Sequence, residues 1–242
     1  MTALFEWRGV DVRLGGNGQV HALKNVSLRI APGERVAVIG PNGSGKSTLL
    51  RALHGLVRVS AGQAMAQPRT GPHAVRQAML FQRPFLLRLS ALHNIRLGLW
   101  LAGHHAWRQT RAPAWEALER VGLADVADRN GRALSGGQQQ RLALARAWAL
   151  KPQVWLLDEP TASLDPHAKR DVEQLMASFA QEPGATMVFS SHNLGQVKRL
   201  AQRVLYLESG QLLADLPVER FFNESVLQAV SPQALAFIKG EV

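Results

Sequence analysis

The feature that most constrains the fold is a glycine-rich segment between an apolar run and a helix-like run. Gly40–Ser47 reads GPNGSGKS and follows Arg35–Ile39, a short apolar run bounded by glycine. Such a run suits a buried strand of a parallel sheet. The next residues, Ser47–Leu56, have apolar positions at helical spacing. A strand, a tight glycine turn and a helix in this order favour an α/β fold.

The same segment fits the pattern G-x-x-x-x-G-K-[S/T], the P-loop, which binds phosphate. Glycine permits unusual backbone angles, so consecutive N–H groups turn inward and act together with the positive end of the helix. We expect Lys46 to neutralise the β- and γ-phosphates and Ser47 to offer its hydroxyl to Mg²⁺. The alternative is a tight turn before a helix that binds nothing. The candidate nucleotide-binding residues here are Gly40, Asn42, Gly43, Ser44, Gly45, Lys46, Ser47 and Thr48.

Two acids follow a second apolar run. Val154–Leu157 reads VWLL and predicts a buried strand, which delivers Asp158 and Glu159 to its carboxyl-terminal edge. Ligands of α/β sheets bind at this edge. We expect Asp158 to hold Mg²⁺ through its water shell, and Glu159 to take a proton from the attacking water or to orient it. A mere helix cap or turn would leave the apolar lead-in unexplained.

The remaining runs predict a single domain over residues 1–242, with a mainly parallel P-loop NTPase core over 1–82 and 150–216. An N-terminal antiparallel β layer is expected from Phe5–Leu14 and His21–Ile30, and a hairpin-like stretch from Gly62 through Pro68 to Phe81. An inserted helical lobe is expected over about 83–149, and an amphipathic tail over 217–242. The other expected elements are a helix over 141–150, a helix over 166–179, a strand over 186–189 and a hairpin over 203–213.

Further segments resemble the ATP-binding cassette (ABC) family over nearly the whole chain. Leu134–Arg141 reads LSGGQQQR and is similar to the signature motif of that family. The resemblance implies that Ser135, Gly137 and the following helix N-terminus form a second anion site. In this family that site closes on the γ-phosphate held by the opposite subunit, so the resemblance also implies a homodimer.

The order of three further residues agrees with the family. By resemblance, Gln82 senses Mg²⁺ and water, Asp165 contacts the other subunit, and His192 reaches the γ-phosphate. Taken singly, His192 could be a satisfied polar residue at a strand end and Gln82 an ordinary loop amide. The aromatic residue that usually stacks on adenine corresponds to Leu14, with Phe5 and Trp7 nearby. Leucine offers apolar contact without π-stacking, so the adenine-stacking residue stays open.

The distribution of charge along the chain indicates which classes of partner it could bind. The formal net charge is +10, and no Asp or Glu occurs from Arg35 to Trp115, where Lys46 and ten arginines fall. This asymmetry indicates a polyanion, an acidic partner, an anionic membrane surface, or simply a solvated basic face. The chain has no cysteine, which excludes disulfides and thiolate metal sites. We see neither a secretory signal nor a run of ~20 apolar residues.

The resemblance to the ABC family implies a Mg²⁺-dependent ATPase beneath a separate membrane permease, at the cytoplasmic face of the inner membrane. Phe81–Ser90 reads FQRPFLLRLS, and its apolar residues among arginines suit a permease-docking surface. The alternative is that Phe85, Leu86 and Leu87 pack within the lobe. The segment resembles importer ATPases for oxyanions, especially tungstate, which implies a solute-binding protein and no direct contact with nucleic acid.

Three rival functions remain. The first is an ABC exporter or lipoprotein-release subunit, which shares this size and segment order. The second is a soluble ABC ATPase acting on nucleic acid, which the basic charge suits. Such proteins usually carry paired cassettes, a long coiled coil or zinc-binding cysteines, and none of these occurs here. The third is a P-loop kinase or other nucleotide enzyme, which would leave Leu134–Arg141 unexplained.

Overall fold

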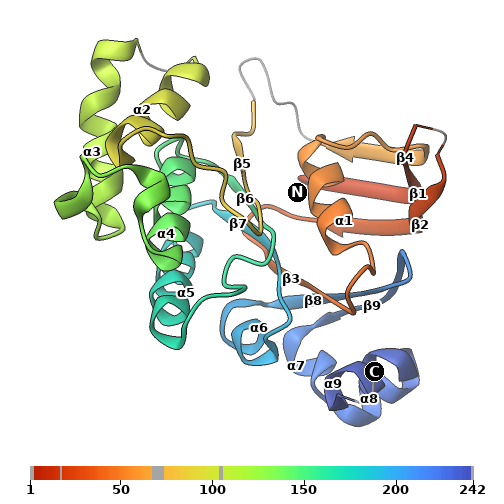
Figure 1. The fold of residues 1–242 in the computed structure, drawn as a ribbon. Helices are drawn as coiled ribbons and strands as arrows, with labels where there is room; N and C mark the ends of the chain where they lie inside the picture. Colours follow the sequence, from red (N-terminus) through yellow and green to blue (C-terminus); the bar gives the residue numbers. More distant parts are fainter. Residues whose placement is uncertain (1–2, 17, 67–73, 104–105, 241–242) are drawn as a thin grey trace.

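The structure is a computed structural model that describes residues 3–16, 18–66, 74–103 and 106–240. A three-stranded antiparallel sheet forms one layer, with strand order β2-β1-β4 (Figure 1). Its strands are β1 (Phe5–Leu14), β2 (Val20–Ile30) and β4 (Ala61–Ala66). The predicted N-terminal antiparallel layer is therefore confirmed.

A six-stranded sheet forms the core, with strand order β5-β6-β7-β3-β8-β9. All neighbouring pairs are parallel except β8 and β9, which form an antiparallel hairpin. The predicted mainly parallel α/β core is thus confirmed. The strands are β3 (Arg35–Ile39), β5 (Gln77–Leu80), β6 (Val154–Leu157), β7 (Thr186–Ser190), β8 (Arg203–Glu208) and β9 (Gln211–Pro217).

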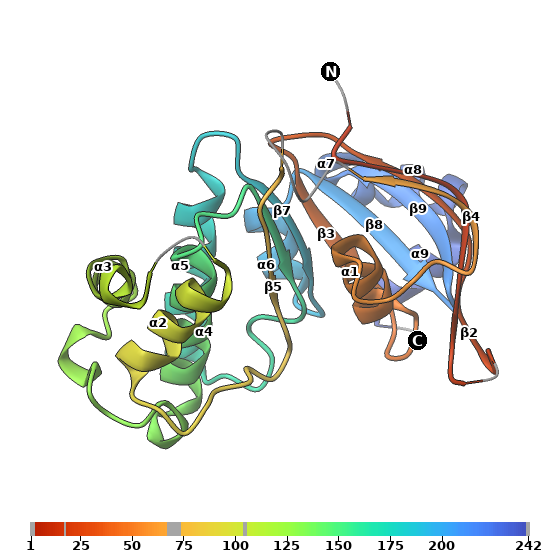
Figure 2. The same ribbon diagram turned by 90° about the horizontal axis from the view of Figure 1, so that it is seen from above.

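The core sheet is buried on both faces. Successive side chains of a strand point to opposite faces. Val36 and Val38 of β3 belong to the apolar cluster shared with β1, β2 and α1 (Lys46–His54). Ala37 and Ile39 belong to the cluster on the other face, with the remaining helices. Helix α1 therefore lies between the two sheets, as both views show (Figures 1 and 2).

Three longer helices gather beside the β5 edge of the core sheet (Figure 1). They are α2 (Ala91–Leu101), α3 (Arg111–Arg120) and α4 (Gly136–Trp148), separated by short 3₁₀ turns. Leu142 and Leu144 of α4 share one buried cluster with Trp155 and Leu157 of β6. The helices thus pack onto the sheet through a common core. None of the described helices is both long and apolar enough to cross a bilayer.

The other helices cover the core sheet and end the chain. Helix α5 (Pro166–Ala180) follows β6, and α6 (Leu194–Leu200) follows β7. The tail forms α7 (Val218–Phe221), α8 (Glu224–Val230) and α9 (Pro232–Lys239). Its apolar residues Phe221, Leu227 and Leu235 are buried in the same cluster as Tyr206 of β8. The predicted amphipathic tail therefore packs on the protein's own sheet.

The structure differs from the prediction at the stretch 62–81 and at helix α6. The stretch 62–81 is not a hairpin: β4 pairs with β1, whereas β5 pairs with β6 in the other sheet, and Pro68 lies outside the described residues. Strand β5 is the edge strand of the core sheet, where alternate residues of it are buried and β6 is its hydrogen-bonded neighbour. Helix α6 was not predicted. It is short, and it is capped by Asn193, whose side chain accepts from the amide of Gln196.

Candidate functional site

The P-loop is shaped by close backbone packing. It connects β3 to α1, and its three glycines all have positive φ angles: 146° at Gly40, 75° at Gly43 and 107° at Gly45. A Cβ on Gly40 would lie 1.9 Å from the carbonyl oxygen of Leu207, and one on Gly45 would lie 2.7 Å from that of Ala22. Only glycine leaves room for these contacts. The loop is therefore fixed from outside by β8 and β2.

Lys46 opens α1 and lies inside the loop. Its Nζ donates to the carbonyl oxygens of Gly40 and Pro41, each at 2.9 Å, and the residue is buried. Burial lowers the pKa of Lys46, and the nearby charges of Glu159 and Asp158 oppose that shift. The ammonium group is thus surrounded by loop oxygens, at the position where the P-loop pattern expects phosphate.

A hydroxyl–carboxylate pair lies beside the lysine. The Oγ of Ser47 donates to Oδ1 of Asp158 at 2.9 Å, and the Oγ of Ser190 donates to the same oxygen at 2.9 Å. Asp158 is buried at the carboxyl end of β6. The predicted magnesium-binding residues Ser47 and Asp158 are therefore brought together from α1 and the end of β6, and Ser190 of β7 bonds to the same carboxylate oxygen.

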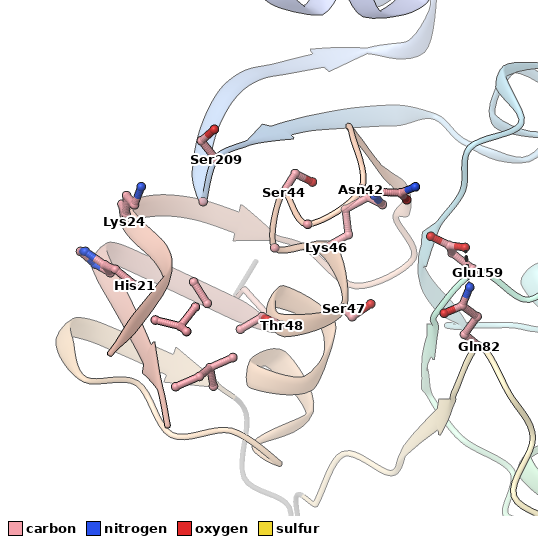
Figure 3. Close-up of a pocket in the computed structure, with 16 residues that line it drawn as sticks. His21, Lys24, Asn42, Ser44, Lys46, Ser47, Thr48, Gln82, Glu159 and Ser209 are labelled. Atoms are coloured by element: carbon pink, nitrogen blue, oxygen red, sulfur yellow. Dashed lines mark hydrogen bonds between the residues drawn. The ribbon is translucent and has the colours of Figure 1, made fainter. Parts of the chain in front are cut away.

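Glu159 is held between two side chains. Its Oε1 lies 2.8 Å from Nε2 of His192, and its Oε2 accepts a hydrogen bond from Nε2 of Gln82 at 3.0 Å. Its backbone has a φ of 46°, and its amide donates to Ser190 Oγ at 2.8 Å. Figure 3 shows the Gln82–Glu159 contact across from the P-loop. The three predicted catalytic residues thus meet, although they come from three different loops.

A cleft of about 490 Å³ is bordered by Lys46, Ser47, Gln82 and Glu159, but not by Asp158 or His192. This volume is within the range of small-molecule sites, about 300–1,000 Å³. The predicted residue Leu14 lines it, together with Asn42, Thr48 and most of the P-loop. Sequence reasoning missed Val20, His21, Ala22 and Lys24 of β2 and the turn Ser209–Gly210, which also line it (Figure 3).

The donor set fits a nucleotide with Mg²⁺. The buried Oγ of Ser44 has no hydrogen-bond partner among the described residues, so this P-loop hydroxyl is left for a ligand. No cluster of three His, Cys, Asp or Glu side chains that could hold a metal occurs in the described part of the chain. Mg²⁺ commonly takes one or two protein oxygens and completes its shell with water and substrate phosphates. Ser47 and Asp158, with Gln82 nearby, would hold it in this way.

The signature residues lie outside this cleft. Ser135 caps α4: its Oγ accepts from the amide of Gln138 at 3.3 Å, and its own amide donates to Gln138 Oε1 at 3.0 Å. A Cβ on Gly137 would lie 2.6 Å from Cβ of Ala168, so the start of α4 packs tightly against α5. Neither Ser135 nor Gly137 lines the nucleotide cleft of its own chain.

Asp165 begins α5 beside the signature segment. Its Oδ1 accepts from the amides of His167 and Ala168 at 2.9 and 3.0 Å. The amide of Ala168, together with that of His167, holds the pKa of this exposed carboxyl below its usual value, although desolvation opposes them. Asp165 also lies outside the cleft of its own chain. Within one chain its role is that of a helix cap.

The predicted permease-docking segment, Phe81–Ser90, contains both exposed and buried apolar side chains. Phe85 is 67% exposed, whereas Leu86 is buried and belongs to the apolar cluster that the helices share with the core sheet. Arg146 of α4 donates to the carbonyl oxygen of Phe85 at 2.9 Å and fixes this loop. Packing within the lobe therefore accounts for Leu86, and an exposed aromatic ring remains at Phe85.

Known proteins resemble this chain in sequence and fold. The family model described as ABC transporter matches residues 23–162. The glutamine transport ATP-binding protein GlnQ of Escherichia coli is 39% identical over 88% of this chain and 90% of its own. The arginine transport ATP-binding protein ArtM of Bacillus subtilis is 38% identical over 85% and 89%. A solved dimer of the cassette MJ0796, bound to ADP and Pi after hydrolysis, has a TM-score of 0.77 and 29% identity, over 88% of this chain and 98% of that one.

Proposed function

The chain belongs to the ABC transporter family, and on that premise we propose that it is the ATP-hydrolysing subunit that drives solute import through a separate permease. As a member of this family it is an ATPase that uses ATP and Mg²⁺. The observation that carries the proposal is the Glu159 carboxylate, held by His192 and Gln82 at the border of the P-loop cleft.

The proposed roles follow from this geometry. Lys46 and the loop amides bind the phosphates, and bound Mg²⁺ neutralises part of their charge. Glu159 orients the attacking water and takes its proton, because its carboxylate is a fixed acceptor beside the cleft. His192 and Gln82 hold that carboxylate in place and reach the terminal phosphate and the water. Leu14 supplies apolar contact to the base.

We propose that two copies act together. Ser135, Gly137 and Asp165 lie outside the cleft of their own chain, yet the start of α4 is the positive end of a helix dipole, which favours an anion. A second copy can bring this helix end onto the nucleotide of the first. The dimeric state of MJ0796, to which this chain is similar, supports this arrangement. Closure on ATP and release after hydrolysis would move the permease.

The relatives favour import of amino acids. GlnQ and ArtM are named for glutamine and arginine transport, and they do not support tungstate, export or a nucleic-acid function. We therefore propose a small polar solute of the amino-acid class, delivered by a solute-binding protein. The cassette would sit peripherally at the cytoplasmic face of the inner membrane. We also propose that the chain is a single domain, divided into a core over 1–82 and 150–216, a helical lobe over about 83–149 and a tail over 217–242.

The proposal is tested by introducing Glu159→Gln into the chromosomal gene and measuring uptake of labelled glutamine, arginine and tungstate. Lys151→Gln, on an exposed residue outside the cleft, is the matched control. Loss of amino-acid uptake in Glu159→Gln alone supports the proposal. Loss of tungstate uptake alone would restore the oxyanion assignment. Unchanged uptake of all three, with loss of ATPase activity in the purified protein, would reject import of these solutes.

A further inference from the structure

The Glu159–His192 pair depends on how two loops are held together. Glu159 directly follows Asp158 at the end of β6, and His192 follows Ser191 at the end of β7. Their side chains meet at 2.8 Å, although neither residue belongs to a helix or strand. Hydrogen bonds between the two loops therefore determine whether the carboxylate and the imidazole stay aligned.

A buried glutamine joins these two loops. Gln196 in α6 is fully buried, and its Oε1 accepts from Ser191 Oγ at 2.6 Å. Its Nε2 donates to Thr161 Oγ1 at 3.2 Å. Both hydroxyl residues are themselves buried. Thr161 lies two residues after Glu159, and Ser191 immediately precedes His192. One amide thus connects the segments that carry the two site residues.

The short turn around His192 is fixed by the same group of residues. The amide of Asn193 donates to Ser191 Oγ at 3.0 Å, and the amide of Gln196 donates to Asn193 Oδ1 at 3.0 Å. His192 lies between these anchors. A small cavity of about 110 Å³ is lined by Glu159, Thr161, Ser191 and His192, so the site and the glutamine network adjoin.

We propose that Gln196 is a positioning residue for ATP hydrolysis, which sets the Glu159–His192 geometry through Thr161 and Ser191. This inference rests on the proposed function of the site. An amide suits this place because it supplies both a donor and an acceptor to the two hydroxyls. It also adds no charge at a fully buried position, where an unpaired charge would be costly.

The test compares Gln196→Met with the unchanged protein. Methionine keeps a similar length and removes both hydrogen bonds. We expect kcat for ATP to fall about 10- to 100-fold, because small displacements of reacting groups have effects of this size. The KM for ATP should change less than about threefold, since the P-loop contacts are untouched. ATP affinity, measured by calorimetry in the Glu159→Gln background, should likewise be unchanged.

Two milder variants, Thr161→Val and Ser191→Ala, test the same connection if Gln196→Met fails to fold. Each should lower kcat, and combining either with Gln196→Met should add little, because the three groups act as one unit. Thr110→Val is the matched control. Thr110 is fully buried and its Oγ1 donates to the carbonyl oxygen of Trp107 at 2.7 Å, but it lies in the helical lobe. It should lose stability and keep kcat.

The proposal is overturned if folded Gln196→Met, or either milder variant, keeps kcat within twofold. It is also overturned if ATP affinity falls in parallel with kcat, or if Thr110→Val loses as much kcat as Thr161→Val. Any of these results would reduce Gln196 to a packing role. The proposed function fails separately, if the unchanged protein does not hydrolyse ATP or if Glu159→Gln has no effect.

Discussion

The imidazole Nε2 of His192 lies 2.8 Å from Oε1 of Glu159, while the side-chain amide of Gln82 donates to Oε2 of the same carboxylate. Both oxygens of the proposed base are therefore engaged, and the carboxylate cannot turn freely. A general base that is already oriented loses little entropy when the water binds.

Replacing His192 should separate catalysis from binding. We expect His192→Ala to lower kcat by about 100-fold or more, because the carboxylate of Glu159 loses its partner and, on the proposed role of His192, the terminal phosphate loses a contact. The KM for ATP should stay within a few fold, since Lys46 and the P-loop are unchanged. Steady-state phosphate release measures both. An unchanged kcat would mean that His192 is only a polar residue at a strand end.

Gly40→Ala should destabilise the whole domain. A Cβ at this position would lie 1.9 Å from the backbone oxygen of Leu207, and the φ of 146° is unfavourable for any other residue. We expect a loss of about 2 kcal/mol or more in the free energy of unfolding, measured with urea. Gly16→Ala is the control, because a Cβ there has no atom within 4 Å. Equal effects of the two changes would contradict the packing of the P-loop against β8.

Leu14→Tyr should strengthen binding of the base. Leu14 lines the cleft without offering an aromatic face. A stacked ring contributes about 0.5–1.5 kcal/mol, so ATP affinity should rise roughly two- to tenfold. Titration calorimetry measures this, with inorganic triphosphate as the control ligand, whose affinity should not change. If Leu14→Tyr raises the affinity for ATP and for triphosphate equally, or raises neither affinity, the base does not bind at Leu14.

Asp165 should make stability depend on acid pH. Helix amides hold its folded pKa below the usual value, so the unfolded chain takes up a proton at higher pH than the folded one. The stabilising effect is therefore present above about pH 4 and is lost as the pH falls through the lower, folded pKa. Asp165→Asn keeps a good cap but cannot titrate. The free energy of unfolding, measured with urea between pH 3 and 7, should fall for the wild type relative to Asp165→Asn only at the acid end. A difference between the two proteins that stays constant with pH would refute this.

Local sequence predicted much of the core of the site. Val154–Leu157 is fully buried on both faces of the sheet, so its continuous apolar run identified the strand and the acids after it. The P-loop pattern likewise predicted a helix directly after the glycine turn, over Ser47–Leu56, and α1 spans Lys46–His54. In both places the chemistry and the fold depend on residues that are neighbours in the chain.

The missed features depend on contacts between distant segments. His21, Lys24 and Ser209 line the cleft because β2 and the β8–β9 turn pack against the P-loop: the amide of Gly210 donates to the carbonyl oxygen of Ser44 at 3.0 Å. No spacing in the sequence indicates this. The pairing of β5 with β6 was missed for the same reason, because residues 77–80 and 154–157 meet only in the folded sheet.

The most direct test of the two-copy ATPase site is the mass of Glu159→Gln in solution, measured by light scattering with and without saturating ATP and Mg²⁺. This variant should bind ATP but hydrolyse it slowly, so we expect a monomer without ATP and a stable dimer with it. Adding Ser135→Arg should abolish the dimer, because the arginine would occupy the proposed anion site at the start of α4. A Glu159→Gln protein that binds ATP and stays monomeric, or a dimer that survives Ser135→Arg, would contradict the account.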